Sequence, residues 1–199
     1  VLPPGDIRRC LLALMEDGEQ RKVAQRLFDD RLEEISGPLK GHSLGNLITA
    51  RLDNIYKGQD RGIDAERKLF RIQAKILPAT LTNIELVAET ASGLKIVGET
   101  NIDYRVKDKN FDPNDKIVRI YFDSRTDTNY EVINNIKEAE KIIFSPGDLY
   151  TSILPHLLVE GVSEAVCKSK AKLIIVLNLA TKQGETDNFK ASDYLKSFI

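Results

Sequence analysis

The sequence predicts an α/β fold: a three-layer Rossmann-like domain with a mostly parallel sheet and helices on both faces. Beyond residue 117, short apolar runs rich in Val and Ile alternate with helical segments, which is the order of successive βαβ units. These runs hold few polar residues, as expected of strands that helices cover on both faces. A chain of 199 residues is also long enough to bury a hydrophobic core. We therefore expect one domain over residues 1–199.

The first third of the chain is expected to be helical, because its apolar residues recur every three or four positions. Asp6, after two prolines, is an N-cap candidate for the first helix. His42 or Ser43 opens the third helix, which should be buried. The predicted helices cover residues 7–14, 20–35, 44–55 and 66–72.

The remaining two thirds predict strands and helices in alternation. A β-hairpin is expected to join 84–89 to 94–99 through Ser92 and Gly93, as an insertion or an edge of the main sheet. The elements that follow are a strand at 118–122, a helix at 131–139, a strand at 142–144, a helix at 153–168 and a strand at 173–177.

Composition excludes some partners. The chain has 29 Lys and Arg against 30 Asp and Glu and no basic run, which argues against nucleic acid as a partner. No apolar stretch approaches the roughly 18 residues that a membrane span requires. Cys10 and Cys167 are far apart in the sequence and fit a reducing cytoplasm better than a disulfide or a metal site. We expect a cytoplasmic protein.

Polar segments follow each predicted strand of the parallel sheet. Ligands of open α/β sheets bind beyond the carboxyl ends of the strands, so these segments should meet at one rim. A helix beginning near Thr151 would add backbone N–H groups suited to a phosphate. An ordinary capped βα loop explains the same residues about equally well. The residues expected at the rim are Ser145, Asp148, Thr151, Ser152, Asn178, Thr181, Gln183, Glu185 and Asp187.

A second candidate is the segment "KGHSLGNL", which enters the buried helix. Its glycines permit close approach of a ligand to the backbone, and its first helical turn offers donors. A capped helix with Gly45 selected for tight packing is the alternative. His42 has no evident partner for general-base catalysis. Arg8 or Arg9 could pair with a phosphate or with Asp6, and a surface ion pair is the simpler explanation.

Several segments together carry a family resemblance. They are "PPGDIRR", "GHSLGNL", "ILPAT", "PGDLYTSILPHLLVEGVSEAV" and "NLATKQGETDNFKASDYL", and they cover nearly the whole chain. In this order they resemble the CofD-like superfamily and, within it, the YvcK branch of gluconeogenesis factors. The resemblance implies a Rossmann-like domain that binds a UDP-sugar or a nicotinamide dinucleotide, NAD(P), and matters for gluconeogenic growth and cell shape. CofD itself transfers a phospholactyl group from a nucleotide-activated donor to a deazaflavin, with a divalent metal.

The resemblance also implies a site, with Asn46 as the foremost side chain and Asp6 as a metal ligand. Members usually begin with a Gly-rich strand and loop and an Asp-rich segment, and neither precedes Val1, so the chain is expected to be a fragment. Ser145 stands where the family commonly has Gly, and its Cβ should narrow the approach of a phosphate. The implied ligand-binding residues are Asp6, Arg8, Gly41, His42, Ser43, Gly45, Asn46, Ser145, Gly147, Asp148, Thr151, Ser152, Asn178 and Thr181.

Three functions remain open at this point. The first is a regulatory protein that binds a nucleotide-type small molecule, since binding loops are plentiful and no GxGxxG, GxxxxGK[ST], HExxH or GxSxG motif occurs. The second is a phospholactyl transferase in which Asp6 and Asp148 would hold Mg²⁺. The third is an interaction scaffold that uses the hairpin at 84–99. Assembly into a homo-oligomer also stays open.

Overall fold

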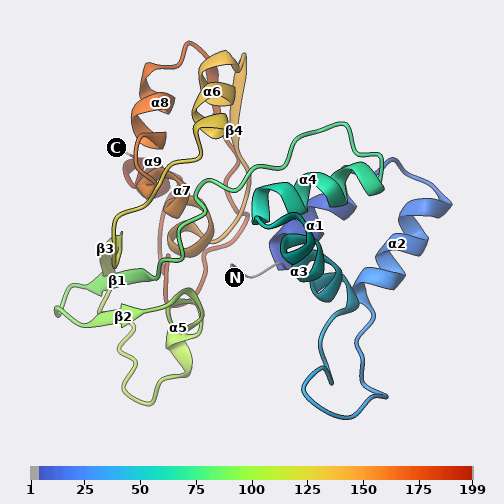
Figure 1. Cartoon of the computed structure of the whole chain (residues 1–199). Coiled ribbons are helices and arrows are strands. Elements are labelled where there is room, and N and C mark those ends of the chain that lie inside the picture. Colours follow the sequence, from blue (N-terminus) through green and yellow to red (C-terminus); the bar gives the residue numbers. More distant parts are fainter. Residues whose placement is uncertain (1–4, 199) are drawn as a thin grey trace. The chain divides into compact units, whose positions relative to one another are not determined.

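The computed structural model describes residues 5–198, with side chains from Ile7 onward. The chain divides into two compact units, Val1–Pro78 and Ala79–Ile199, called here the N-terminal and C-terminal units (Figure 1). Each unit is described by itself, and a single domain over residues 1–199 stays a prediction. None of the described helices is long and apolar enough to cross a membrane.

The N-terminal unit is helical, as predicted, but its fourth helix spans Gln59–Leu69 and begins seven residues before the predicted start at 66. Its core gathers Leu11, Met15, Ala24 and Ile72, and the rings of Phe28 and Phe70 meet edge to face at 5.0 Å. The helices are α1 (Gly5–Leu14), α2 (Glu19–Asp29), α3 (Leu44–Tyr56) and α4 (Gln59–Leu69).

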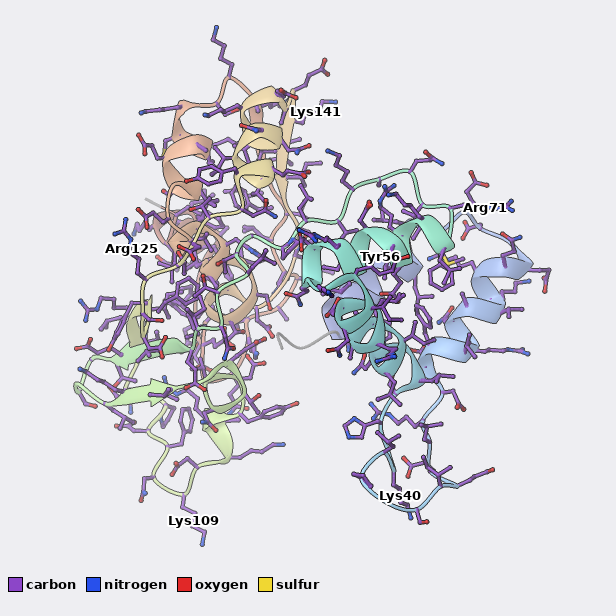
Figure 2. The ribbon with its side chains drawn as sticks, viewed as in Figure 1. Lys40, Tyr56, Arg71, Lys109, Arg125 and Lys141 are labelled. Atoms are coloured by element: carbon purple, nitrogen blue, oxygen red, sulfur yellow. The ribbon has the colours of Figure 1, made fainter. Side chains whose placement is uncertain are left out.

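Helix α2 ends at Asp29, six residues before the predicted end. Asp30 adopts extended backbone angles, and Arg31 pairs with Ser43 in an isolated antiparallel bridge. The Leu32 N–H donates to the His42 carbonyl at 3.1 Å, so the segment between α2 and α3 folds back on itself. Lys40 lies at the far tip of this loop (Figure 2). The helical spacing of apolar residues continues in the sequence beyond Asp29. In the structure, this segment forms hydrogen bonds across the loop instead of helical ones.

The buried face of α3 differs from the predicted one. Gly45 and Thr49 are its fully buried residues, whereas Ile55 is 55% exposed. Close helix contacts explain this: a Cβ on Gly62 of α4 would lie only 2.8 Å from the backbone nitrogen of Asp53, and a Cβ on Gly45 would lie 3.0 Å from the Phe28 ring on α2. Helices this close bury small residues at the contact instead of the larger apolar stripe.

The C-terminal unit combines two small sheets with short helices. The antiparallel sheet has the order β2-β1-β3 and the parallel sheet joins β4 to β5. Its elements are β1 (Leu86–Thr90), β2 (Lys95–Val97), α5 (Glu99–Asp103), η1 (Arg105–Lys107), β3 (Ile117–Phe122), α6 (Tyr130–Glu138), β4 (Lys141–Phe144), the π-helical turn η2 (Leu149–Ile153), α7 (Pro155–Leu158), α8 (Val162–Lys168), β5 (Lys172–Ile175) and α9 (Ala191–Lys196).

The mixed α/β class is confirmed, and so are the hairpin and the three later strands. The pairing of one strand was predicted wrongly: β3 does not join the parallel sheet but pairs antiparallel with β1, with Val87 opposite Tyr121. Val118 in β3 is 63% exposed, so its apolar run is not covered on both faces. A run of β-branched residues identifies a strand but not its partner.

The helix predicted over 153–168 is interrupted. Val159 leaves the helical region, and Gly161 adopts a left-handed conformation with φ of 79°, which glycine permits at little cost. The result is the turn η2 followed by the short helices α7 and α8. Leu149, Tyr150 and Leu154 from this stretch pack into the core of the unit.

Candidate functional site

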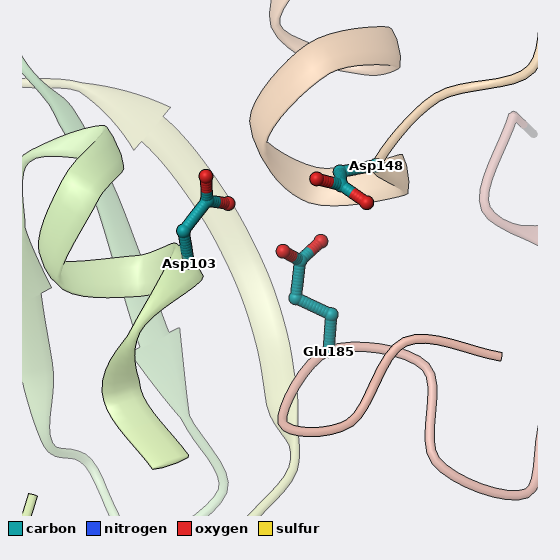
Figure 3. Close-up of side chains that lie close together, drawn as sticks. All are labelled: Asp103, Asp148 and Glu185. Atoms are coloured by element: carbon teal, nitrogen blue, oxygen red, sulfur yellow. The ribbon is translucent and has the colours of Figure 1, made fainter. Parts of the chain in front are cut away.

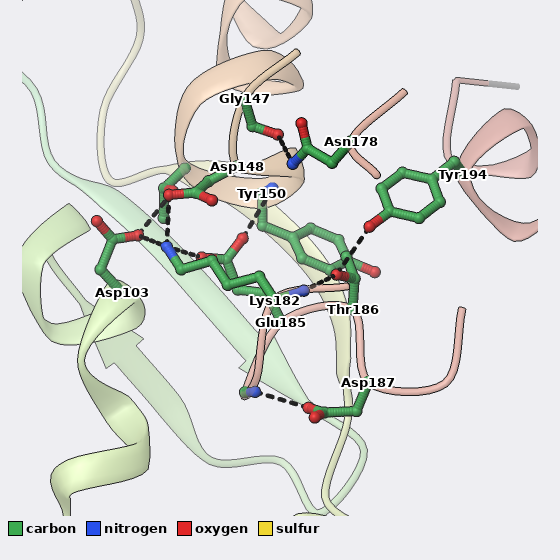
Figure 4. Close-up of polar contacts among 12 residues, drawn as sticks. Asp103, Gly147, Asp148, Tyr150, Asn178, Lys182, Glu185, Thr186, Asp187 and Tyr194 are labelled. Atoms are coloured by element: carbon green, nitrogen blue, oxygen red, sulfur yellow. Dashed lines mark hydrogen bonds and ion pairs between the residues drawn. The ribbon is translucent and has the colours of Figure 1, made fainter. Parts of the chain in front are cut away.

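One lysine in the C-terminal unit is surrounded by three carboxylates. The Lys182 Nζ lies 2.7 Å from Asp103 Oδ1, 2.6 Å from Asp148 Oδ2 and 2.7 Å from Glu185 Oε1 (Figure 4). We call these four residues the Lys182 cluster. Figure 3 shows the three carboxylates converging from three separate segments, and their oxygens lie within 4.8 Å of one another.

Strand pairing explains why distant segments meet here. β4 and β5 run parallel with Ile142 opposite Leu173, so both strands end at the same edge. Asp148 lies in the loop that follows β4, and both Lys182 and Glu185 lie in the loop that follows β5. Asp103 is the last residue of α5. Two of the three carboxylates thus come from the edge at which the sequence predicted a site.

Direct hydrogen bonds tie the two loops together. The Asn178 side-chain amide donates to the Gly147 carbonyl at 2.8 Å, and the Tyr150 N–H donates to Glu185 Oε2 at 3.3 Å. The Thr151 hydroxyl donates to Asp103 Oδ1 at 2.7 Å. The cluster therefore fixes the positions of both loops relative to α5.

Hydrogen bonds and close packing fix the conformation of the motif "TKQGETD". The Lys182 N–H and the Tyr194 hydroxyl both donate to the Thr186 hydroxyl oxygen, at 2.8 and 3.0 Å, and Thr186 is almost fully buried. Gly184 has φ of 85°, and a Cβ there would lie 2.6 Å from a Val106 methyl carbon. Its N–H donates to Asp187 Oδ2 at 2.6 Å. These contacts present Lys182 and Glu185 toward the cluster.

In the Lys182 cluster, burial and ion pairing shift the pKa values in opposite directions. Burial lowers the pKa of Lys182, but hydrogen bonds to the carboxylates outweigh this and raise the pKa above its ordinary value. Burial raises the pKa of Glu185, and the ammonium only partly offsets that effect. For Asp103, Lys182 and Thr151 outweigh burial, and the pKa is lowered. With all four groups ionised, three negative charges and one positive charge leave a net charge of −2.

This arrangement positions loops and does not supply a reactive group. A nucleophilic or basic amine must lose its proton, and the three carboxylates hold Lys182 in its charged form. The residues also do not fit a metal as they stand, because the ammonium lies where a cation between the carboxylates would lie. No catalytic step through a metal at this cluster follows from the structure.

The rim residues predicted from the sequence fall into three groups. Asp148 and Thr151 belong to the cluster or bind it, and Gly147 and Asn178 tie the loops together. Exposed positions at the same edge are taken by Ser145, Ser152 and Thr181.

A cavity of about 20 Å³ at this edge is lined by Ser145, Gly147 and Asn178 together with apolar side chains such as Phe144 and Ile153. It has room for about one water molecule.

The expected helix N-terminus near Thr151 is not available to a phosphate. The N–H groups of Ser152 and Ile153 both donate to the Asp148 carbonyl, at 2.8 and 3.0 Å. The Tyr150 N–H is taken by Glu185. The prediction of backbone donors at this point was wrong, because a short π-helical turn formed there and used them within the chain.

The second predicted group lies in the N-terminal unit, where most of its members have structural roles. Arg8 Nη1 donates to the Ser43 hydroxyl at 2.6 Å and to the Phe28 carbonyl at 3.0 Å. Ser43 caps α3 by accepting from the Asn46 N–H and itself donates to the Phe28 carbonyl at 2.8 Å. A Cβ on Gly45 would lie 2.7 Å from Arg8 Cδ, so tight packing explains this glycine.

The remaining members of this group are Gly41, His42, Asn46 and Asp6. Gly41 has φ of 77° and its carbonyl accepts from Arg31, while His42 is exposed. The side-chain oxygen of Asn46 is buried without a hydrogen-bond partner in the part of the chain that the structure describes. The side chain of Asp6 lies outside the described residues, and its predicted role as a metal ligand stays a prediction.

Sequence reasoning missed a second acidic pair, in the N-terminal unit. Glu66 on α4 is fully buried, and the Thr49 hydroxyl donates to its Oε2 at 2.9 Å. Burial and the nearby charge of Asp53 raise the pKa of Glu66 to about 7. Both carboxylate oxygens of Asp53 are buried without a hydrogen-bond partner among the described residues, and burial raises this pKa too. We call Asp53 and Glu66 the α3–α4 pair.

Sequence reasoning also missed Asp103 and Lys182. Asp103 is one acidic residue in a polar connection and carries no local signal of its partners. Lys182 is the one basic residue of the motif "TKQGETD". Its place beside Glu185 in that motif was the signal that could have identified it.

Comparison with known proteins gives a consistent picture. The family model described as 2-phospho-L-lactate transferase CofD matches residues 1–199. The chain is 40% identical over 196 residues to a Thermotoga maritima protein named "Putative gluconeogenesis factor", covering 98% of this chain and 58% of that protein. It is 37% identical over 198 residues to the "Gluconeogenesis factor" of Halalkalibacterium halodurans, covering 99% of this chain and 58% of that protein.

Two crystal structures of a Bacillus halodurans protein are also similar to the chain. One superposes with a TM-score of 0.86 at 37% identity and covers 98% of this chain and 59% of that one. The other, described as a member of the UPF0052 family, gives 0.85 at 38% identity with the same coverage. The chain thus spans somewhat more than half the length of the relatives that it matches.

Proposed function

The chain belongs to the CofD family, and we propose from this that it binds a UDP-sugar or a nicotinamide dinucleotide, NAD(P). We place it in a cytoplasmic protein that regulates gluconeogenic growth and cell shape. In this proposal β4 and β5 are two strands of a Rossmann-like parallel sheet, and the ligand binds at their carboxyl edge.

One observation carries the proposal: the loops that follow β4 and β5 leave the same edge and are linked by the Asn178–Gly147 hydrogen bond. Ser145 and Thr181 lie on these loops and Ser152 lies in the turn η2, and all three residues are exposed. We assign the ligand's phosphates to their hydroxyls, since the net negative charge of the Lys182 cluster repels phosphates. Ser145 replaces a glycine of the family pattern, and its hydroxyl supplies a donor there.

Thermal unfolding tests the proposal. A ligand that binds only the folded state raises the unfolding midpoint, so millimolar UDP-glucose, NAD⁺ or NADP⁺ should raise it by about 3–6 °C. Uridine, which lacks phosphates, serves as the control and should give a much smaller shift. No shift with any of the three nucleotides would contradict the proposal.

A matched pair of variants locates the site. Asn178→Asp replaces the amide donor to Gly147 by a carboxylate and should weaken nucleotide affinity about tenfold or more, measured by calorimetry below both unfolding midpoints. Asn135→Asp makes the same chemical change at an exposed position on α6, where the amide donates to the Glu131 carbonyl, and should leave affinity unchanged. Equal affinities for the two variants would remove the site from this edge.

The family description also supports a second function, transfer of a phospholactyl group from a nucleotide-activated donor to a deazaflavin. Incubation of the protein with both substrates and Mg²⁺, followed by chromatography, should then give the phospholactyl deazaflavin. Nucleotide binding without product would contradict the transferase function and leave the regulatory function as the proposal.

A further inference from the structure

We propose that Lys182 is the resident cation of its cluster and excludes divalent metal from it, so that Asp103, Asp148 and Glu185 bind a metal ion only when this lysine is removed. The inference concerns the cluster alone and does not rest on nucleotide binding. It follows from the donor set, the charge balance and the way in which the chain holds the ammonium.

The donor set is one that a divalent cation would accept. Three carboxylates converge with oxygens within 4.8 Å of one another, and oxygen ligands suit Mg²⁺, Mn²⁺ and Ca²⁺. The distances of 2.6–2.7 Å from Lys182 Nζ suit an ammonium, whereas Mg²⁺ prefers oxygens at about 2.1 Å. A metal would therefore need the carboxylates to close in by about half an ångström, and the lysine must leave first.

The charge balance favours a cation in the cluster. Glu185 is 1% exposed in its side chain, and Asp103 and Asp148 are 26% and 36% exposed, so their mutual repulsion is only partly screened by solvent. Without Lys182 the three ionised groups would carry a charge of −3. A divalent ion in place of the ammonium would leave a net charge of −1 instead of −2. The three carboxylates without Lys182 would therefore attract such an ion strongly.

Lys182 competes with dissolved metal from a tethered position. Its backbone N–H is fixed to the buried Thr186, and only 25% of its side chain is exposed. A tethered group has a high effective concentration, which gives the ammonium an advantage over a freely diffusing ion. Lys168, by contrast, pairs with Glu164 on the surface of α8, and its side chain is 75% exposed.

Mn²⁺ titration without nucleotide tests the proposal, by calorimetry and by the loss of the free-ion electron paramagnetic resonance signal. Lys182→Ala should bind one Mn²⁺ at least about tenfold more tightly than the wild-type chain does. Adding Asp148→Asn to this variant should abolish the gain. Lys168→Ala removes the same charge from an exposed ion pair, and this variant should bind Mn²⁺ as wild type does.

Lys182→Met covers a failure of the alanine variant to fold, since methionine keeps most of the buried stem. Millimolar Mn²⁺ should raise the unfolding midpoint of whichever variant folds by about 5 °C and leave wild type unchanged. The proposal is overturned if a folded Lys182 variant binds Mn²⁺ no better than wild type. It is also overturned if wild type binds Mn²⁺ and Asp148→Asn removes that binding, or if neither variant folds even with Mn²⁺ present.

Discussion

The two units bury carboxylates in opposite ways. In the C-terminal unit, three carboxylates surround Lys182, whose ion pairs with them offset part of their negative charge. In the N-terminal unit, Glu66 accepts a hydrogen bond from the Thr49 hydroxyl, and the carboxylate oxygens of Asp53 have no hydrogen-bond partner among the described residues. Ionised groups need a cation, whereas a protonated carboxyl needs only a hydrogen-bond partner. The difference teaches that a lysine partly compensates one cluster, whereas burial and the raised pKa of Glu66 favour a proton in the other.

The largest expected effect comes from removing the lysine. Lys182→Met leaves three carboxylates facing one another and should lower the free energy of unfolding by about 3–5 kcal/mol at pH 7 in metal-free buffer. Urea denaturation followed by circular dichroism measures it. Lys168→Met, at the exposed pair on α8, should leave the free energy of unfolding almost unchanged, because solvent screens that pair. Similar losses in both variants would show that the Lys182 cluster is not a compensated charge centre.

A second prediction concerns protonation in the α3–α4 pair. The folded pKa of Glu66, about 7, lies above that of an exposed glutamate, so the folded state keeps a proton that the unfolded state releases. Its contribution to stability is full below the unfolded pKa and is lost as pH rises through about 7. Between pH 5 and pH 8 the free energy of unfolding should fall by on the order of 2 kcal/mol from this residue.

Glu66→Gln tests the assignment, because glutamine cannot ionise and its amide can donate to nearby acceptors. The variant should lose this part of the pH dependence and be more stable than wild type at pH 8. Glu34→Gln, at an exposed position, should keep the wild-type slope. Chemical denaturation at several pH values measures both, and an unchanged slope in Glu66→Gln would show that a cation and not a proton compensates this pair.

A third prediction concerns the close contact that buries the α3–α4 pair. A Cβ at position 62 would lie 2.8 and 2.9 Å from the backbone nitrogen and Cα of Asp53, so Gly62→Ala should force α3 and α4 apart. We expect a loss of about 1–3 kcal/mol. By admitting water, the variant should also shift the pH dependence assigned to Glu66 toward lower pH. Gln25→Ala on the exposed face of α2 should alter neither quantity.

Local signals in the sequence predicted much of the fold. Apolar spacing identified α1 and α3, Ser43 caps α3 as predicted, and Ser92 with Gly93 identified the hairpin. The predicted N-cap of the first helix was wrong, because α1 begins at Gly5 and Asp6 lies inside it. What those signals could not supply was the partner of β3 or the break at Gly161. Strand pairing depends on contacts between residues far apart in the chain, and one glycine can either continue a helix or end it.

The candidate site shows the same division. "PGDLYTS" and "TKQGETD" follow strands that the sequence itself identified, and it therefore placed Asp148, Thr151 and Asn178 at one edge. Only the tertiary structure brought Asp103 to that edge from the end of α5 and turned Lys182 into the centre of three carboxylates. Only the packing of α4 on α3 buried Glu66. The reason is physical: the type of residue fixes which charges are available, but burial and distance, which arise from long-range packing, decide whether a charge is paired, protonated or exposed.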